Sequence, residues 1–220
     1  TQHSVKSLLE LGIQPNMLVC RSELELSQEI RNKIGLFCNV DSNSVISAYD
    51  CSTIYEVPVN LFEQNFDRLV LKKLRLPDIN IQFDKWRDFV DKIKNPKGAI
   101  NIAVCGKYTD YLDAYKSISE SFIHAGAEND VKVNVKYISA EDFTKRKPEN
   151  LLKNVDGVLV PGGFGERGIE GKLVAIQFVR ENKIPFLGIC LGMQCAVIEF
   201  SRNVLGIKKA NSSEFVKNQY

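Results

Sequence analysis

Short apolar runs alternate with segments of helical spacing after Gly98, and this alternation constrains the fold more than any other feature of the sequence. An apolar run followed by an amphipathic segment is typical of a βαβ unit, whose strands lie parallel. Such strands are covered by helices on both faces. We therefore expect an α/β fold with a doubly wound, mostly parallel sheet. The expected strands cover residues 99–105, 131–138, 155–160 and 184–189, and the expected helices cover 113–125 (capped by Asp113), 171–182 and 192–204.

The first 83 residues have the same kind of alternation in a shorter form, and we interpret them as a separate domain. Residues 84–98 form a predicted linker with one amphipathic helix, on which Trp86 and Phe89 are packing residues. Residues 99–220 form the second domain. Within residues 1–83 the expected strands are 17–20 and 45–48, and the expected helices are 5–11, 27–37 (with Ser27 as N-cap) and 61–74.

Charge and cysteine content exclude several classes of protein. Lys and Arg number 29 against 27 Asp and Glu, so the net charge of +2 does not favour a nucleic-acid or membrane partner. The longest apolar stretch, residues 184–190, is too short to span a bilayer. Six cysteines without a C-x-x-C pair, together with two histidines, predict no metal site and a reducing, cytoplasmic setting. The chain begins with Thr1 and enters patterned sequence at once, so we expect a piece of a longer protein.

The segment Gly188-Ile189-Cys190-Leu191-Gly192 is the strongest candidate for chemistry, because it joins a predicted strand to a predicted helix. In a nucleophile elbow of this type, a tight turn forces the central residue into a strained conformation that small flanking residues permit. The helix N-terminus favours the thiolate of Cys190, and the N–H of Leu191 points to where an oxyanion would form. The alternative is a buried cysteine in a glycine-flanked turn.

A second glycine-rich segment, Pro161-Gly162-Gly163-Phe164-Gly165, also follows a predicted strand. Its glycines would expose backbone N–H groups and let a substrate approach closely. The alternative is a turn that only joins a strand to a helix. Since both segments end parallel strands, we expect them at the same edge of the sheet.

These two segments resemble the triad-type class I glutamine amidotransferases, and the whole chain resembles the CTP synthase family. The fold implied is the carboxyl-terminal part of a synthetase domain (1–83), a linker (84–98) and the first half of a glutaminase domain (99–220). The other segments that carry the resemblance are Thr1 to Val5, Gly12 to Pro15, Cys20 to Ser22, Lys33-Ile34, Phe37 to Val40, Asp113 to Ser117 and Asn211 to Phe215.

The resemblance implies a two-part reaction. A synthetase domain uses ATP and Mg²⁺ to phosphorylate UTP, and ammonia from glutamine then displaces the phosphate to give CTP. The resemblance further implies that GTP activates the glutaminase, that CTP inhibits the enzyme as its product, and that the enzyme is a homotetramer that can form filaments. No tightly bound organic cofactor is implied.

The resemblance also assigns residues in the glutaminase part. Cys190 corresponds to the nucleophile, and Gly162 and Leu191 to the oxyanion donors. Gly163 and Glu214 correspond to positions that contact the carbon frame and the α-amino group of glutamine. The glutamine site is further lined by Leu191, Gly192, Met193 and Gln194.

In the amino-terminal part, Thr1, Gln2 and Lys33 correspond to positions that bind UTP or CTP. Arg21, Tyr49, Asp50 and Cys51 correspond to positions that contact ATP. Without the resemblance, Lys33 and Arg21 would be interpreted as solvated surface residues, and Glu214 as an acid in a loop. We interpret His124 and His3 as structural.

The family's His and Glu of the triad, its phosphate-binding loop and its magnesium carboxylates have no counterpart in these 220 residues. We therefore expect this piece alone to have little or no activity. Two alternatives remain open, namely another cysteine enzyme on the same type of sheet, such as an amidotransferase-like peptidase, and a non-catalytic oligomerisation fragment.

Overall fold

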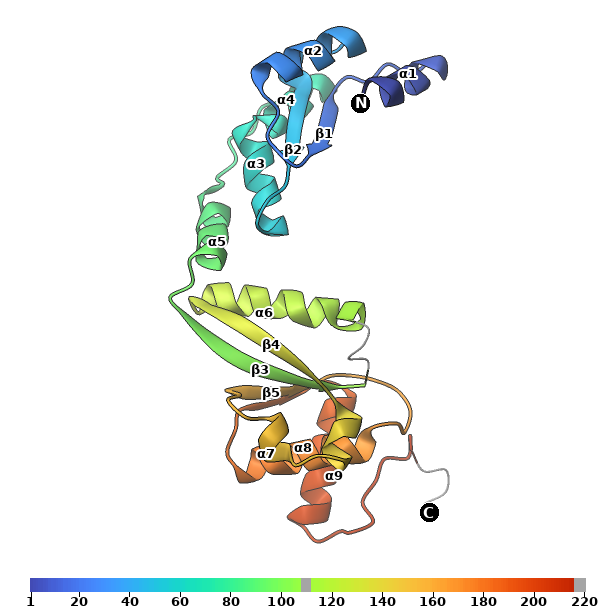
Figure 1. Cartoon of the computed structure of the whole chain (residues 1–220), viewed down its shortest axis with the longest axis vertical. Helices are drawn as coiled ribbons and strands as arrows, with labels where there is room; N and C mark the ends of the chain where they lie inside the picture. Colours follow the sequence, from blue (N-terminus) through green and yellow to red (C-terminus); the bar gives the residue numbers. More distant parts are fainter. Residues whose placement is uncertain (108–111, 216–220) are drawn as a thin grey trace. The chain divides into compact units, whose positions relative to one another are not determined.

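The computed structural model describes residues 1–107 and 112–215, and the chain divides into two compact units, Thr1–Asp91 and Lys92–Tyr220. In the first unit, β1 (Leu18–Ser22) and β2 (Val45–Tyr49) form a parallel pair, with Leu18 opposite Val45. A parallel pair requires a crossover, which α2 (Gln28–Cys38) supplies (Figure 1). As predicted, Ser27 caps this helix, since its side chain accepts a hydrogen bond from the backbone N–H of Ile30.

The segment predicted as one helix over 61–74 forms two helices, so this prediction is wrong. They are α3 (Val57–Glu63) and α4 (Phe66–Leu74), and Asn65 between them has a φ of 54°. The apolar spacing continues across the break, whereas asparagine tolerates the left-handed conformation that ends α3. The remaining elements of this unit are α1 (Gln2–Glu10), the short 3₁₀ turns η1 (Ser42–Ser44) and η2 (Ile54–Glu56), and α5 (Asp84–Lys94).

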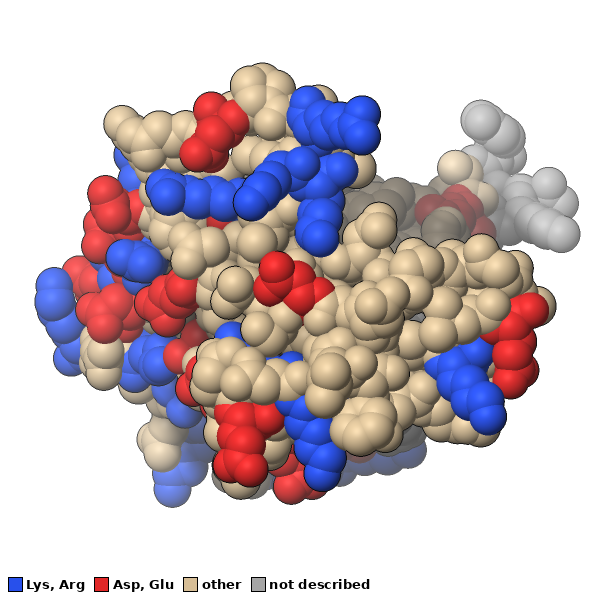
Figure 2. All heavy atoms as spheres, turned by 90° about the horizontal axis from the view of Figure 1, so that it is seen from above, with Lys and Arg blue, Asp and Glu red and all other residues tan. Residues whose placement is uncertain are grey.

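Helix α5 packs against the first unit through its aromatic residues. The indole N–H of Trp86 donates to the backbone carbonyl of Tyr55 at 2.9 Å, and the Phe89 ring meets the Tyr55 ring edge-on at 5.4 Å. The packing role predicted for Trp86 and Phe89 is confirmed. Figure 2 shows Lys and Arg side chains interspersed with Asp and Glu over the face in view, consistent with the small net charge.

The second unit contains a four-stranded parallel sheet in the order β4-β3-β5-β6. Its strands are β3 (Gly98–Gly106), β4 (Val131–Ser139), β5 (Gly157–Val160) and β6 (Phe186–Gly188). The chain moves from β3 to one neighbour, β4, and then crosses to the other side for β5 and β6. This reversal creates a switch point at the carboxyl ends of β3 and β5, where open α/β sheets bind ligands.

Helices cover both faces of this sheet (Figure 1). Helix α6 (Lys116–Glu128) packs on β4 from one side, and α8 (Ile169–Glu181) and α9 (Leu191–Asn203) pack together on the other. The predicted α/β fold with a doubly wound parallel sheet is therefore confirmed. Asp113 does not cap α6, because it lies in a 3₁₀ turn, η3 (Leu112–Tyr115), that precedes the helix. The sequence analysis also missed η4 (Ala140–Thr144) and α7 (Pro148–Leu151).

The core of the second unit lies between the sheet and the pair α8 and α9. Cys105 from β3 and Cys195 from α9 are both buried there as small core residues, and burial raises the pKa of the Cys105 thiol to about 12. Among the described residues, no group of three or more His, Cys, Asp or Glu side chains has the arrangement of a metal site. No helix in the described ranges is long and apolar enough to cross a membrane.

Candidate functional site

Cys190 occupies a strained turn between β6 and α9. Its backbone has φ 51° and ψ −107°, a conformation that costs a non-glycine residue about 1–3 kcal/mol. The turn presents the side chain at the carboxyl edge of the sheet, and Cys190 is exposed, whereas Cys20, Cys38, Cys105 and Cys195 are buried. This is the elbow conformation that the glycine-flanked pattern predicts.

The two glycines of the elbow are required by close backbone contacts. A Cβ atom on Gly188 would lie 2.6 Å from the carbonyl carbon of Gly192. A Cβ atom on Gly192 would lie 2.0 Å from the carbonyl oxygen of Val160 in β5. Because neither distance is compatible with a side chain, the first turn of α9 can approach the sheet only if both positions are glycine.

The glycine-rich segment after β5 lies directly beside Cys190. Strands β5 and β6 are neighbours, with Val160 opposite Gly188, and the Ile189 N–H donates to the Val160 carbonyl at 2.9 Å. The Cβ position of Gly162 is 3.6 Å from the Cβ of Cys190. The two segments, which are 23 residues or more apart in the sequence, thus lie side by side and form one small cradle of backbone groups beside Cys190.

One basic side chain contacts the glycine segment directly, and a second contacts the backbone of the first. The Lys107 ammonium donates to the Phe164 carbonyl at 2.9 Å, and the Arg167 guanidinium donates to the Lys107 carbonyl at 3.2 Å. Arg167 is also paired with Glu141 at 3.3 Å. The sequence analysis did not single out these residues, since an exposed lysine or arginine in a loop gives no signal of the backbone it will contact.

The N-terminus of α9 supplies an anion-stabilising environment at Cys190. Cys190 is the N-cap residue and makes no side-chain capping bond, so the first N–H groups of the helix are not satisfied by its side chain. These groups and the helix dipole favour negative charge at this point. The arrangement can stabilise both a thiolate and an oxyanion formed next to it.

Of the other residues predicted to contact glutamine, two lie next to the elbow and one lies in a later segment of the chain. Met193 and Gln194 are in the first turn of α9. The side-chain oxygen of Gln194 is buried without a hydrogen-bond partner among the described residues, so it can accept one from a ligand. Glu214 is exposed in the segment after α9, where its N–H donates to Ser212 Oγ at 3.2 Å. Within the described ranges, no hydrogen bond or ion pair joins Glu214 to Cys190.

The two histidines lie away from the elbow or in the other unit. His124 is on α6, which packs on β4, and the sheet order places β4 three strands from β6, or about 14 Å at ~4.8 Å per strand. His3 is exposed on α1 in the first unit. This placement agrees with the structural interpretation of both residues.

In the first unit, the residues predicted to contact ATP meet where β1 and β2 end. Arg21 forms an ion pair with Asp50 and also donates to the Ala48 carbonyl at 3.1 Å. Tyr49 ends β2, and the Cys51 thiol donates to the Tyr49 carbonyl at 3.5 Å. All four predicted residues therefore lie at one edge of the two-stranded sheet.

The residues predicted to bind the pyrimidine nucleotide are less clearly assembled. The Thr1 hydroxyl lies 3.9 Å from Cys20 Sγ, which places the start of α1 beside β1. Gln2 begins α1, and Lys33 is exposed on α2, a helix in contact with α1. Within the described part of the chain, no hydrogen bond joins Lys33 to Thr1 or Gln2.

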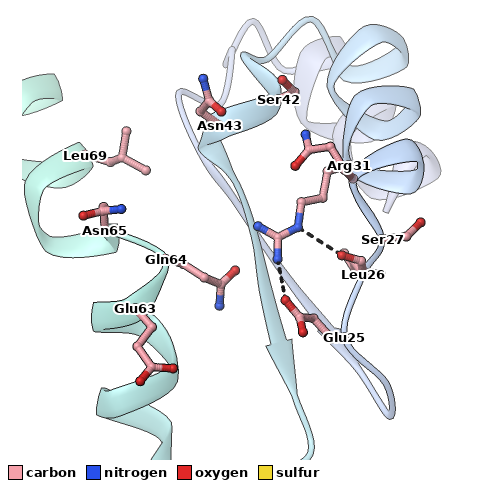
Figure 3. A pocket seen from close by; sticks show the side chains of 11 residues that line it. Glu25, Leu26, Ser27, Arg31, Ser42, Asn43, Glu63, Gln64, Asn65 and Leu69 are labelled. Carbon is pink, nitrogen blue, oxygen red and sulfur yellow. Dashed lines mark hydrogen bonds and ion pairs between the residues drawn. The ribbon is translucent and has the colours of Figure 1, made fainter.

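The sequence analysis did not predict a polar pocket of about 810 Å³ in this unit (Figure 3). At one side, the Arg31 guanidinium donates to the Leu26 carbonyl and to Glu25 Oε1, each at 3.1 Å. None of its lining residues is one of the predicted nucleotide contacts. The lining residues are Glu25 to Gln28, Arg31, Ser42, Asn43, Glu63 to Asn65 and Leu69.

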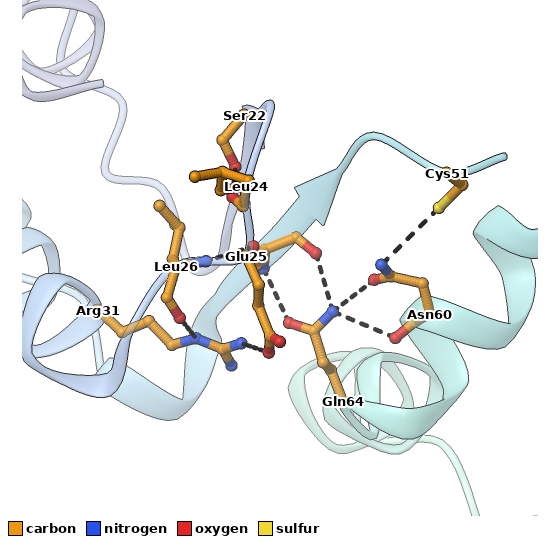
Figure 4. Close-up of polar contacts among 9 residues, drawn as sticks. Ser22, Leu24, Glu25, Leu26, Arg31, Cys51, Asn60 and Gln64 are labelled. Carbon is orange, nitrogen blue, oxygen red and sulfur yellow. Dashed lines mark hydrogen bonds and ion pairs between the residues drawn. The ribbon is translucent and has the colours of Figure 1, made fainter.

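Beside this pocket, the Gln64 side chain pairs with β2 in the way that a neighbouring strand would (Figure 4). Its amide oxygen accepts from the Ser47 N–H and its amide nitrogen donates to the Ser47 carbonyl, both at 2.8 Å. The same nitrogen donates to Asn60 Oδ1 at 2.6 Å, and Asn60 Nδ2 lies 4.0 Å from Cys51 Sγ. These contacts connect the middle of β2 to Cys51, which lies two residues after the end of the strand.

Comparison with known proteins places the chain among relatives of one kind. A family model described as "Glutamine amidotransferase class-I" matches residues 110–219, and one described as "CTP synthase N-terminus" matches residues 1–76. A CTP synthase from Methanocaldococcus jannaschii is 54% identical over 99% of this chain and 42% of its own length. A CTP synthase from Pelodictyon phaeoclathratiforme is 58% identical over 99% of this chain and 39% of its own length. The chain thus spans about two fifths of the length of these curated relatives.

A solved structure is also similar to part of the chain. It is described as the glutaminase domain of Trypanosoma brucei CTPS with bound acivicin. It is 43% identical to this chain, with a TM-score of 0.51, and the match covers 54% of this chain and 47% of the solved one.

Proposed function

Because this chain belongs to the glutamine amidotransferase class-I family, we propose that it is part of a glutamine-hydrolysing CTP synthase, a ligase that aminates UTP to CTP. The similarity over 99% of the chain to CTP synthases of more than twice its length supports this proposal. In this proposal, residues 1–83 are the end of the synthetase domain, 84–98 a linker and 99–220 the first half of the glutaminase domain.

In the proposed glutaminase reaction, the Cys190 thiolate attacks the side-chain amide carbon of glutamine. A sulfur–carbon bond forms, and the carbonyl electron pair moves to oxygen, where N–H groups of Leu191 and Gly162 stabilise it. When the oxyanion collapses, the carbon–nitrogen bond breaks and the leaving group takes a proton and departs as ammonia. Water then cleaves the thioester to release glutamate and restore the thiol. The proton carrier is the His that the family resemblance implies outside these residues.

Substrate recognition is proposed to use the residues around this turn. Gly163, Leu191, Gly192 and Met193 would line the carbon frame of glutamine, and Glu214 would receive its α-ammonium group. The buried oxygen of Gln194, which lacks a hydrogen-bond partner in the described part of the chain, supports a binding role, because a bound ligand could donate to it.

The synthetase part is proposed to bind nucleotides at the ends of its strands. Arg21, Tyr49, Asp50 and Cys51 would contact ATP, and their common position where β1 and β2 end supports this assignment. Thr1, Gln2 and Lys33 would contact UTP or the product CTP. Mg²⁺ would accompany ATP, and no residue of this chain is proposed as its ligand.

The wider properties are proposals that rest on the family alone. They comprise activation of the glutaminase by GTP, inhibition by CTP, assembly into homotetramers and filaments, and a cytoplasmic location. The six free cysteines are compatible with a reducing compartment.

The observation that carries the proposal is the exposed Cys190 in a strained turn, with its Cβ 3.6 Å from the Cβ position of Gly162 after the neighbouring strand. The test is Cys190→Ser in the full-length protein, assayed with glutamine and with external ammonia as alternative nitrogen sources. We expect glutamine-dependent CTP formation to fall at least about 10³-fold, since a serine hydroxyl is not activated here, while ammonia-dependent formation is retained. Retention of glutamine-dependent activity, or labelling by a glutamine-like electrophile at another cysteine, would refute the proposal.

A further inference from the structure

Lys172 on α8 is a buried lysine that the reaction described above does not use. Its side chain is 1% exposed and is one of the largest fully buried side chains in the described ranges. A charged group is costly to bury unless an opposite charge or hydrogen-bond acceptors compensate it. Among the described residues, no carboxylate forms an ion pair with its Nζ, since the neighbouring Glu170 and Glu141 pair with arginines.

The carboxylates of this region are directed to other partners. Glu170, two residues earlier on α8, pairs with Arg202 at 3.0 Å, and Glu141 pairs with Arg167 at 3.3 Å. Burial lowers the pKa of Lys172 from its ordinary value, and the groups that act on it electrostatically are Cys195, Lys107 and Cys105. Burial raises the pKa of both thiols, so neither carries a compensating negative charge at neutral pH.

The Lys172 ammonium lies close to the glycine segment that follows β5. A Cβ atom placed on Gly163 would be 3.7 Å from Lys172 Nζ and 3.4 Å from Leu191 Cδ2. Gly163, in the glycine loop after β5, therefore lies close both to the Lys172 ammonium and to the side chain of Leu191, the first residue of α9. Since the region is buried, the field of the ammonium is weakly screened.

We propose that Lys172 is a positioning residue whose buried positive charge stabilises the oxyanion formed in the cradle of Gly162 and Leu191. The inference rests on the proposed glutaminase reaction. The glutamine amide is neutral when it binds, and negative charge appears on its oxygen only after the thiolate attacks. An ammonium group close to the glycine segment therefore acts on the transition state more than on the bound substrate.

The test is Lys172→Met in the full-length protein, because methionine removes the charge and retains an unbranched apolar side chain. We expect kcat for glutamine to fall about 10- to 100-fold, an effect no larger than the one caused by removing a direct oxyanion donor. KM for glutamine should change less than about threefold. Ammonia-dependent CTP formation should be retained. Lys132→Met, an exposed lysine near the start of β4, is the matched control and should leave both rates unchanged.

A second readout separates an effect on the oxyanion from one on the thiol. Iodoacetamide alkylates a thiolate by displacement and forms no oxyanion, so the alkylation rate of Cys190, followed by mass spectrometry, should stay within about twofold of wild type. The proposal is overturned if kcat is unchanged, if alkylation slows in parallel with kcat, or if ammonia-dependent activity is lost to the same extent. If Lys172→Met does not fold, Lys172→Gln is tested by the same criteria.

Cys190→Ser, measured in parallel, distinguishes the two hypotheses. If Cys190→Ser abolishes glutaminase activity and Lys172→Met does not reduce it, only the role of Lys172 is wrong. If Cys190→Ser leaves the activity intact, the glutaminase mechanism itself is wrong.

Discussion

The substitution Gly192→Ala tests whether the close approach of α9 to β5 positions the reacting thiol. A Cβ atom at position 192 would lie 2.0 Å from the Val160 carbonyl oxygen, and contacts under 3.0 Å essentially do not occur. The helix start and β5 must therefore separate by at least 3.0 − 2.0 = 1.0 Å. The carbonyl cannot swing aside freely, because it accepts the Ile189 N–H at 2.9 Å.

The consequence for catalysis follows from this displacement. Cys190 immediately precedes α9, so a shift of the helix changes its separation from Gly162, which is 3.6 Å between the Cβ positions. A misplacement of about 1 Å costs roughly 10²-fold in rate. We therefore expect Gly192→Ala to lower glutamine-dependent kcat about 100-fold and to destabilise the protein by about 1–3 kcal/mol through overpacking.

Two other glycines of the second unit provide controls for stability. Gly126→Ala on α6 would place a Cβ 2.5 Å from the Val131 carbonyl oxygen, so it should destabilise the protein, but it lies near the start of β4 rather than at the elbow. Gly98→Ala makes only an ordinary 3.7 Å contact and should be neutral. We expect both variants to retain glutamine-dependent kcat within about threefold, measured beside ammonia-dependent activity and thermal unfolding.

The reasoning would be refuted by either of two results. If Gly192→Ala keeps wild-type kcat and KM, the contact between α9 and β5 does not control the position of the thiol. If Gly126→Ala lowers glutamine-dependent kcat as much as Gly192→Ala does, the loss reflects general destabilisation and not displacement of Cys190.

Two further predictions concern the polar contacts of each unit. Gln64→Ala leaves the buried Ser47 N–H and carbonyl unpaired, so we expect the free energy of unfolding, measured by thermal unfolding, to fall by about 2–3 kcal/mol. We also expect a raised KM for ATP and an unchanged KM for glutamine. An equal rise in both KM values would contradict the proposed link to the end of β2. Burial would raise the pKa of Glu199, but hydrogen bonds from Arg180 and Asn203 bring it below its ordinary value of 4.5. The contribution of ionised Glu199 to the free energy of unfolding is therefore full above about pH 4.5 and is lost as the pH falls through the folded pKa. Glu199→Gln should lower the free energy of unfolding by about 2 kcal/mol at pH 7 and by less at pH 3. An equal loss at both pH values would refute the assignment.

The elbow could be predicted from the sequence because its constraints are local. Glycine two residues before and two residues after Cys190, at the end of an apolar run, is a pattern that requires a sharp turn. The sequence does not specify the order of the strands in the sheet. The predicted proximity of Gly162 to Cys190 therefore depended on the assumption that both strands end at the same edge. The parallel pairing of Val160 with Gly188 supplies that contact.

The errors of the sequence analysis occurred where local pattern and backbone conformation disagree. Apolar spacing continues across Asn65, so periodicity predicted one helix although a single left-handed residue divides it. Asp113 is a residue type that favours helix caps, but a 3₁₀ turn takes up residues 112–115 and the helix starts at Lys116. Periodicity reports which face is apolar, and it does not report where the backbone breaks.

Lys172 shows a different limit of sequence reasoning, since its environment arises only when three elements pack together. In the sequence it is one lysine on an amphipathic helix, a pattern that predicts a solvated side chain. In the structure Lys172 is buried, its ammonium lies close to Gly163 in the loop after β5, and Cys105 of β3 and Cys195 of α9 act on it electrostatically. A charge held in this way loses hydration in the resting protein, so its stabilising effect is greatest when an anion forms nearby. The free-energy cost of burying the Lys172 side chain is thus consistent with a site in which negative charge exists only during the reaction.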